Sequence, residues 1–295
     1  MKPSNFMPII ALILILMLSG CGKAAETKPA PGAPSTTTSN STATPSPSPA
    51  PASTSERAKL KVGISAGVEE EIWKKVKETA AKDNLDIEIV TFNDYILPNK
   101  ALADGQLDAN AFQHEPYLNQ FKADNKLDIV KLANTLNFPI GLYSKKIKNV
   151  SEIKEGDELG LPNDPTNGAR ALILFERAGL IKLKEGVGVK ATVRDIADNP
   201  KKLKFKELEA PFIPKALPDL TAAVINTNYA VDNGFVPTKD AIFIEPKDSP
   251  WVNLIAVRTA DKDKPVFQRL VKAYHSEEVK QFVLDKYGSY IVPSW

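Results

Sequence analysis

The sequence predicts an α/β fold, built as two α/β lobes with a cleft between them. Three observations lead to this prediction. Segments with strand-like alternation are followed by segments with apolar residues at helical spacing, which is typical of strand–helix units and of largely parallel sheets. The alternation continues over about 237 residues, enough for one large or two medium domains. Aromatic and amide residues stand directly after several predicted strands, where such folds place their functional groups.

The first lobe is predicted to comprise residues 60–137 and 248–295. Its first strand covers residues 60–64, where apolar residues alternate with others. Gly67 then precedes a helix with apolar residues at positions 68, 72, 73, 76 and 80, and three glutamates in its first turn complement the helix dipole. The other elements expected here are strands at 87–92, 109–112, 127–132 and 252–257, short helices at 98–105 and 116–123, and one or two helices within 265–286.

The second lobe is predicted to comprise residues 138–247, beginning with strands at 138–143 and 159–161. The loop 162–165 leads into a deeply buried helix, which Thr166 or Asn167 caps and which runs to Ala178 before Gly179 ends it. Further strands are expected at 222–225 and 241–244. No internal repeat interrupts this order.

Residues 1–20 are predicted to be a secretory signal. Lys2 supplies a positive start, thirteen largely apolar residues follow at 6–18, and small residues precede Cys21. Thirteen apolar residues are too few to span a bilayer comfortably as a helix, which needs about 20. The segment Leu18-Ser19-Gly20-Cys21 also resembles the lipobox of bacterial lipoprotein signals, which implies that Cys21 becomes the lipidated N-terminus and anchors the chain on the extracytoplasmic side of the cell membrane. An uncleaved anchor or a chance free thiol is the alternative.

The lipidated Cys21 is predicted to begin a disordered tether that covers residues 21–59. Residues 22–59 contain no Leu, Ile, Val or aromatic residue and consist mainly of Ala, Pro, Ser and Thr. Such a segment cannot bury enough apolar surface to offset the entropy of ordering it. A flexible chain of this length would place its ends roughly 30 Å apart, and a Pro-rich extended one about 100 Å apart.

Composition excludes several classes of function. A net charge of +2 gives no indication of a nucleic-acid partner. Because Cys21 is the only cysteine, the folded part has no disulfide or thiolate metal site, and the two histidines, His114 and His275, are too few for a histidine-rich zinc site. The sequence has no Gly-x-Ser-x-Gly elbow and no His-Glu-x-x-His motif. We therefore expect no cofactor and no enzymatic activity.

Four candidate residues for a binding site also have an ordinary structural explanation when each is taken alone. Phe112 is typical of a core, and His114 of a structural hydrogen bond. Arg170 is typical of a solvated surface charge, and Asn226 of a turn cap. The functional interpretation depends on their shared position after predicted strands, and on the sequence motifs around them.

Four stretches of the sequence carry a resemblance to a known family: Val90–Tyr95, Asn110–Leu118, Leu161–Asn167 and Ala223–Thr227. Together they resemble the NlpA family, the methionine-binding lipoproteins of bacterial ABC importers, and they occur in the family's order. The stretch Ser249–Leu254 also fits, although we expect Tyr or Phe more often than Trp at position 251. The resemblance implies a type II periplasmic-binding-protein fold, whose lobes close on a small amino acid, and delivery to an ABC permease with a cytoplasmic ATPase.

Roles for these residues follow from the resemblance and from the chemistry of methionine. Arg170, in the first turn of its predicted helix, is expected to hold both carboxylate oxygens through paired N–H groups. Asn226 and Asn253 would bind the ammonium or the carboxylate, and His114 would stand at the rim of the cleft. Aromatic walls suit a thioether; the candidates are Tyr95, Phe112, Tyr117 and Phe138.

The ligand and the function retain alternatives at this point. The same fold can hold L-methionine, D-methionine, a methionine derivative, another small amino acid or a methionine-containing dipeptide. One methylene changes discrimination by only about 1–3 kcal/mol, so the sequence does not separate these ligands. A surface adhesin, a chaperone or an enzyme are the other classes of function.

Overall fold

The computed structural model describes residues 56–247 and 249–295. The predicted signal, Cys21 and the tether up to residue 55 lie outside the described residues. None of the helices within the described ranges is both long and apolar enough to cross a membrane.

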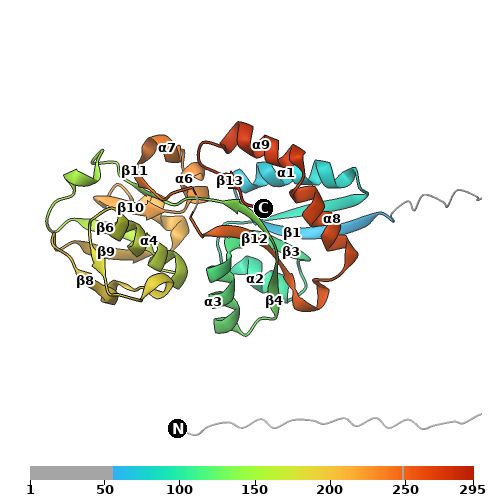
Figure 1. Cartoon of the computed structure of the whole chain (residues 1–295), viewed down its shortest axis with the longest axis horizontal. Coiled ribbons are helices and arrows are strands. Elements are labelled where there is room, and N and C mark those ends of the chain that lie inside the picture. The colour runs from blue at the N-terminus through green and yellow to red at the C-terminus, as the bar shows by residue number, and fades with distance from the viewer. Residues whose placement is uncertain (1–55, 248) are drawn as a thin grey trace, which may run out of the picture. The chain divides into compact units, whose positions relative to one another are not determined.

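The first sheet has six strands in the order β13-β4-β12-β3-β1-β2. Figure 1 shows α1, α8 and α9 on one face of this sheet and α2 and α3 on the other. The strands are β1 (Ala58–Ser65), β2 (Leu85–Phe92), β3 (Ala109–His114), β4 (Ile129–Asn137), β12 (Val252–Arg258) and β13 (Val292–Pro293), and the helices are α1 (Val68–Ala81), α2 (Leu97–Ala103), α3 (Glu115–Asn125), α8 (Pro265–Tyr274) and α9 (Glu277–Tyr287).

The second sheet has five strands in the order β11-β5-β10-β6-β9. Its strands are β5 (Gly141–Tyr143), β6 (Glu158–Pro162), β9 (Lys204–Leu208), β10 (Ala222–Ile225) and β11 (Ala241–Ile244), and its helices are α4 (Pro165–Arg177), α5 (Ile213–Ala216), α6 (Thr227–Asp232) and α7 (Pro237–Asp240). A small separate ribbon pairs β7 (Lys182–Leu183) with β8 (Ile196–Asp198). Short 3₁₀ turns occur at Val150–Glu152, Gly188–Lys190, Val193–Asp195, Ala210–Phe212 and Thr259–Asp261.

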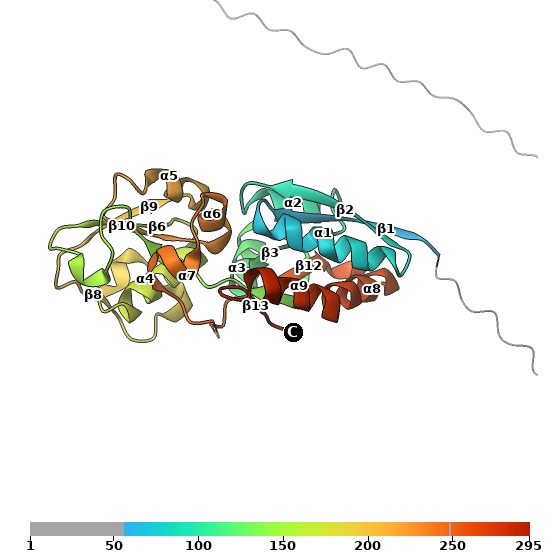
Figure 2. The ribbon, with the colours of Figure 1, turned by 90° about the horizontal axis from the view of Figure 1, so that it is seen from above.

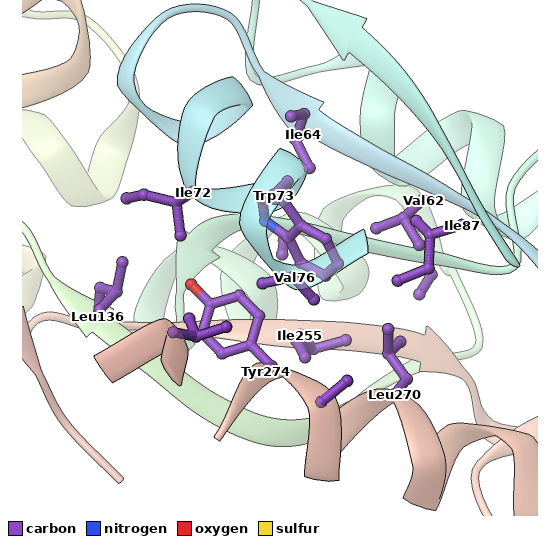
Figure 3. Packing of buried hydrophobic residues seen from close by; sticks show 14 of the residues in the cluster. Val62, Ile64, Ile72, Trp73, Val76, Ile87, Leu136, Ile255, Leu270 and Tyr274 are labelled. Carbon is purple, nitrogen blue, oxygen red and sulfur yellow. The ribbon is translucent and has the colours of Figure 1, made fainter. Parts of the chain in front are cut away.

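The core of the first lobe forms where α1 and α8 pack against each other and against the sheet (Figure 3). Trp73 is buried and its ring centroid lies 5.1 Å from that of Tyr274. Ile72 and Val76 lie on the same face of the helix as Trp73, because residues three and four apart share a face. Burying each side chain of this size contributes about 1.5–3 kcal/mol, so the predicted amphipathic pattern explains why α1 forms and where it packs.

Two crossovers join the sheets, and hydrogen bonds hold them side by side. The chain leaves β4 after Asn137 and enters β5 at Gly141, and it returns between β11 and β12. The Asn137 side-chain amide donates to the Ser249 carbonyl at 2.7 Å, and the Glu245 amide donates to the Ile140 carbonyl at 2.9 Å. Both sheets thus meet at one hinge, and the lobes that we propose, 60–137 with 248–295 and 138–247, follow the two sheets.

The prediction of largely parallel sheets was wrong. Strands β1, β2 and β3 are parallel, as are β6, β9 and β10. However, β12 runs antiparallel to β3 and β4, and β5 runs antiparallel to β10 and β11. Parallel pairing requires a long crossover connection, usually a helix, whereas β5 and β12 each enter their sheet directly from the hinge.

Several boundaries also differ from the predicted ones. Strand β1 begins at Ala58, inside the predicted tether, and Arg57 and Lys59 form ion pairs with Asp86 and Glu88 on β2 at 2.6 and 2.7 Å. Residues 138–140 belong to the crossover rather than to β5. The sequence reading missed the half-exposed strand β9 and the short helix α6.

Candidate functional site

A pocket lies between the two lobes and contains about 430 Å³ of space that atoms do not fill, part of it open to solvent. The residues that line it come mostly from the ends of strands and from the first turns of the following helices. All eight predicted site residues line this pocket: Tyr95, Phe112, His114, Tyr117, Phe138, Arg170, Asn226 and Asn253.

Three aromatic side chains form one wall of the pocket. Phe112 lies on β3, Tyr95 follows β2, and Tyr117 lies in the first turn of α3. The ring centroid of Tyr95 is 5.8 Å from that of Phe112 and 6.1 Å from that of Tyr117. Such clustered rings present an apolar, polarizable surface, which suits a thioether or another apolar group.

His114 lies in the wall of the pocket and not at its rim, because its side chain is buried. Its Nδ1 accepts a hydrogen bond from the Tyr117 amide at 3.2 Å, so Nε2 carries the hydrogen and donates to Asn167 Oδ1 at 3.3 Å. Burial and the nearby Arg170 charge lower the pKa of His114 to about 3. The imidazole is therefore neutral at physiological pH.

Arg170 is buried in an ion pair, in contrast to a solvated surface charge. Its Nε donates to Glu245 Oε1 at 3.1 Å, and its Nη2 donates to Glu245 Oε2 and to the Phe138 carbonyl, the latter at 3.0 Å. The guanidinium also lies 5.3 Å from the centroid of the Trp251 ring. Among the residues that the structure describes, Nη1 has no hydrogen-bond partner, so this group remains available to a ligand.

Two expectations about Arg170 need correction. The helix α4 begins at Pro165, so Arg170 lies in its second turn and not its first. The cap is Asp164, whose carboxylate accepts from the Asn167 amide at 2.9 Å, and not Thr166 or Asn167. Glu245 and the Phe138 carbonyl already accept hydrogen bonds from the Nε and Nη2 hydrogens. The guanidinium therefore has only some of its N–H groups left to bind the two carboxylate oxygens of a ligand, fewer than predicted.

Two amide groups in the pocket have buried atoms without partners. Asn226 Nδ2 donates to Asn167 Oδ1 at 3.0 Å, but Asn226 Oδ1 and Asn228 Nδ2 have no hydrogen bond among the described residues. Asn226 occupies the N-cap position of α6, yet its side chain makes no capping hydrogen bond, which argues against a turn cap. An unsatisfied buried polar atom costs about 1–3 kcal/mol, so this pair indicates a polar ligand.

Sequence reasoning missed a buried carboxylate in the pocket. Glu69 lies in the first turn of α1 with 6% of its surface exposed, and its Oε2 accepts from the Ser65 amide at 3.0 Å. Burial raises the pKa of Glu69 to about 8, although hydrogen bonds from Ser65 and Asn253 oppose the rise. The predicted role of the first-turn glutamates, to complement the helix dipole, does not account for this buried carboxylate. The signal in the sequence that could have indicated this is the spacing of Glu69, three residues before Ile72 and four before Trp73, which places it on the same buried face of the helix.

The remaining predicted residues frame the pocket near the hinge. Asn253 on β12 is in register with His114 on β3, and its side-chain amide donates to the Phe112 carbonyl at 3.2 Å. Phe138 lies at the start of the first crossover and is nearly buried. The other residues that line the pocket and that were not predicted as site residues are Ser65, Gln113, Asn167, Thr227 and Asn228.

Two α/β lobes, joined by paired crossovers and enclosing a pocket of aromatic, amide and charged groups, define a two-lobed ligand-binding protein. Residues 60–295 match the model of the family described as NlpA lipoprotein. The chain belongs to the NlpA lipoprotein family.

Individual relatives agree with this assignment. The D-methionine-binding lipoprotein MetQ of Escherichia coli K12 is 48% identical over 240 residues, which cover 80% of this chain and 88% of the relative. A nutrient binding protein from Burkholderia cenocepacia, solved bound to methionine, is 49% identical with a TM-score of 0.78, covering 80% of this chain and 100% of the other. An ABC transporter periplasmic substrate-binding protein from Coxiella burnetii is 43% identical with a TM-score of 0.77, with coverages of 80% and 100%. The predicted periplasmic-binding-protein fold is confirmed.

Proposed function

We propose that this chain is the substrate-binding lipoprotein of an ABC importer, which captures methionine outside the membrane and delivers it to the permease and its cytoplasmic ATPase. The observation that carries this proposal is a single pocket that combines a guanidinium, a buried carboxylate, unpaired amides and an aromatic wall. The names of the relatives from E. coli and B. cenocepacia support methionine as the ligand, and that of the C. burnetii relative supports an ABC transporter.

We propose a partner in the pocket for each part of the methionine zwitterion. Arg170 Nη1 would bind the carboxylate, because the remaining guanidinium hydrogens are occupied within the protein. Asn226 Oδ1 and the carboxylate of Glu69 would accept from the ammonium group. The thioether would lie against the rings of Tyr95, Phe112 and Tyr117, with Phe138, His114 and Asn253 completing the enclosure.

We propose binding without catalysis, as the names of the relatives describe binding proteins. The chirality of the ligand stays open, because L-methionine and D-methionine present the same three groups. A methionine-containing dipeptide would need more length beyond either charged end. A direct comparison of these ligands therefore decides the specificity.

Methionine should raise the melting temperature of the purified protein. A ligand at 100 times its Kd stabilises the folded state by about 2.7 kcal/mol, which corresponds to roughly 5–10 °C for a domain of this size. Differential scanning fluorimetry with L-methionine, D-methionine and a methionine dipeptide measures this shift, with aspartate as a control. A flat response to all three methionine compounds contradicts the proposed ligand.

Substitution of Cys21 should release the protein from membranes. Cys21→Ala removes the thiol that carries the proposed lipid, and this lipid is the proposed membrane anchor. Membrane fractionation of cells that express the variant measures the effect, with Ser35→Ala in the tether as the control. Continued recovery of Cys21→Ala with the membranes contradicts lipid anchoring through this residue.

A further inference from the structure

Two tyrosines form hydrogen bonds across the cleft in opposite directions. Tyr95 follows β2 in the first lobe, and its hydroxyl donates to Asn228 Oδ1 in the second lobe at 2.7 Å. Tyr229 lies on α6 in the second lobe, and its hydroxyl donates to the Asn93 carbonyl in the first lobe at 3.2 Å. Each hydroxyl therefore bonds to the lobe that does not carry it.

The two rings also contact each other. Their centroids lie 5.1 Å apart with an interplanar angle of 39°, and Tyr95 packs against the core cluster that contains Tyr229. Aromatic pairs at this separation attract each other beyond the effect of their buried area. When the lobes separate, this contact and both hydrogen bonds are lost together.

The two tyrosines differ in their relation to the pocket. Tyr95 lines the pocket, whereas Tyr229 does not, although its chain neighbours Asn226, Thr227 and Asn228 do. Tyr229 and these three neighbours all belong to the start of α6. This helix lies at the side of the second lobe that faces the first (Figure 2). A ligand that engages Asn226 thus acts on the same helical turn that carries Tyr229.

We propose that Tyr95 and Tyr229 form a clasp that holds the lobes closed, and that Tyr229 is a positioning residue which slows ligand release without touching the ligand. This inference rests on the proposed function, because it concerns how the bound amino acid is retained. A residue that stabilises the closed state alone changes the dissociation rate more than the association rate, since association begins from separated lobes.

The variant Tyr229→Phe tests the clasp because it retains the ring and removes only the hydroxyl. Loss of one such hydrogen bond corresponds to about a threefold to tenfold effect. We expect L-methionine to dissociate from the full chain about threefold to tenfold faster, with the association rate within twofold of the wild type. Stopped-flow fluorescence in detergent solution measures both rates.

Tyr143→Phe is the matched control. Tyr143 belongs to the same core cluster as Tyr229, but its buried hydroxyl has no hydrogen-bond partner among the described residues. Its removal should therefore leave both rates unchanged. Unchanged dissociation in Tyr229→Phe, equal acceleration in both variants, or a loss confined to association would each overturn the proposal.

Hydrogen exchange of the ligand-free full chain separates failure of the clasp from failure of the proposed function. Amides within residues 93–97 should exchange faster in Tyr229→Phe than in the wild type, and at the wild-type rate in Tyr143→Phe. If the wild type captures no methionine, the proposed function fails, and this exchange still decides the clasp. Equal exchange in all three proteins overturns it.

Discussion

Replacing Arg170 with alanine is expected to weaken methionine binding by at least about 2 kcal/mol, roughly 30-fold in Kd. Among the described residues that line the pocket, Arg170 is the one cation, so its removal would leave the ligand carboxylate buried without a charged partner. Isothermal titration calorimetry measures the loss. Arg177→Ala is the control, because Arg177 lies exposed on the same helix and its loss should change the affinity by less than about 0.5 kcal/mol.

The same substitution should also destabilise the fold, since it leaves Glu245 buried without its partner. Breaking a buried ion pair on one side costs about 3–5 kcal/mol. The double variant Arg170→Ala/Glu245→Gln removes the stranded charge, so it should recover part of the free energy of unfolding but none of the affinity. Denaturant unfolding and calorimetry separate the two effects. Unchanged affinity in folded Arg170→Ala removes Arg170 from the ligand site.

The sequence was sufficient to find the pocket because most of its members share a chain position. Tyr95, Phe112 and Asn226 stand at or just after strand ends, and the ends of neighbouring strands meet at one side of a sheet. Regular alternation made those strand ends visible in the sequence. Pairs such as Arg170 and Glu245 were not predictable, because they are 75 residues apart and depend on how the hinge folds back.

The fold was predictable where burial determines the spacing of apolar residues in the sequence. It was not predictable where an element is exposed or where its direction depends on the hinge. Helix α1 was found because its apolar residues recur at helical spacing. Strand β9 was missed because its side chains are half-exposed or exposed and carry three lysine or glutamate residues in five. The antiparallel direction of β12 was not predictable, because strand direction depends on the route of the chain and alternation along a strand does not report it.

Glu69→Gln is expected to alter the pH dependence of stability. In the folded protein the pKa of Glu69 is about 8, against an ordinary value of 4.5. Between these values the folded state holds a proton that the unfolded state has lost, so the free energy of unfolding falls as pH rises, by about 1.4 kcal/mol per pH unit. Below pH 4.5 both states are protonated, and the contribution is fully present. Glutamine does not titrate. The free energy of unfolding of Glu69→Gln, relative to that of the wild type, should therefore increase steadily from pH 5 to 7.

The affinity for methionine should also depend on pH through the Glu69 carboxylate. It should rise with pH, whereas the free energy of unfolding falls. An ammonium group beside Glu69 favours the ionised form, so binding at pH 7 must release a proton, and the affinity should rise by up to about tenfold per pH unit between pH 6 and 7. In Glu69→Gln this dependence disappears, and the affinity at pH 7.5 falls by about 1 kcal/mol, because a charge-assisted hydrogen bond becomes a neutral one. Calorimetry in two buffers of different ionisation enthalpy counts the released proton, with Glu78→Gln, an exposed position on the same helix, as the control.

Equal proton release in Glu69→Gln and the wild type would place the ammonium group away from Glu69. The ammonium group would then donate to neutral oxygens of the pocket, such as Asn226 Oδ1, which are weaker partners for a full positive charge than a carboxylate is.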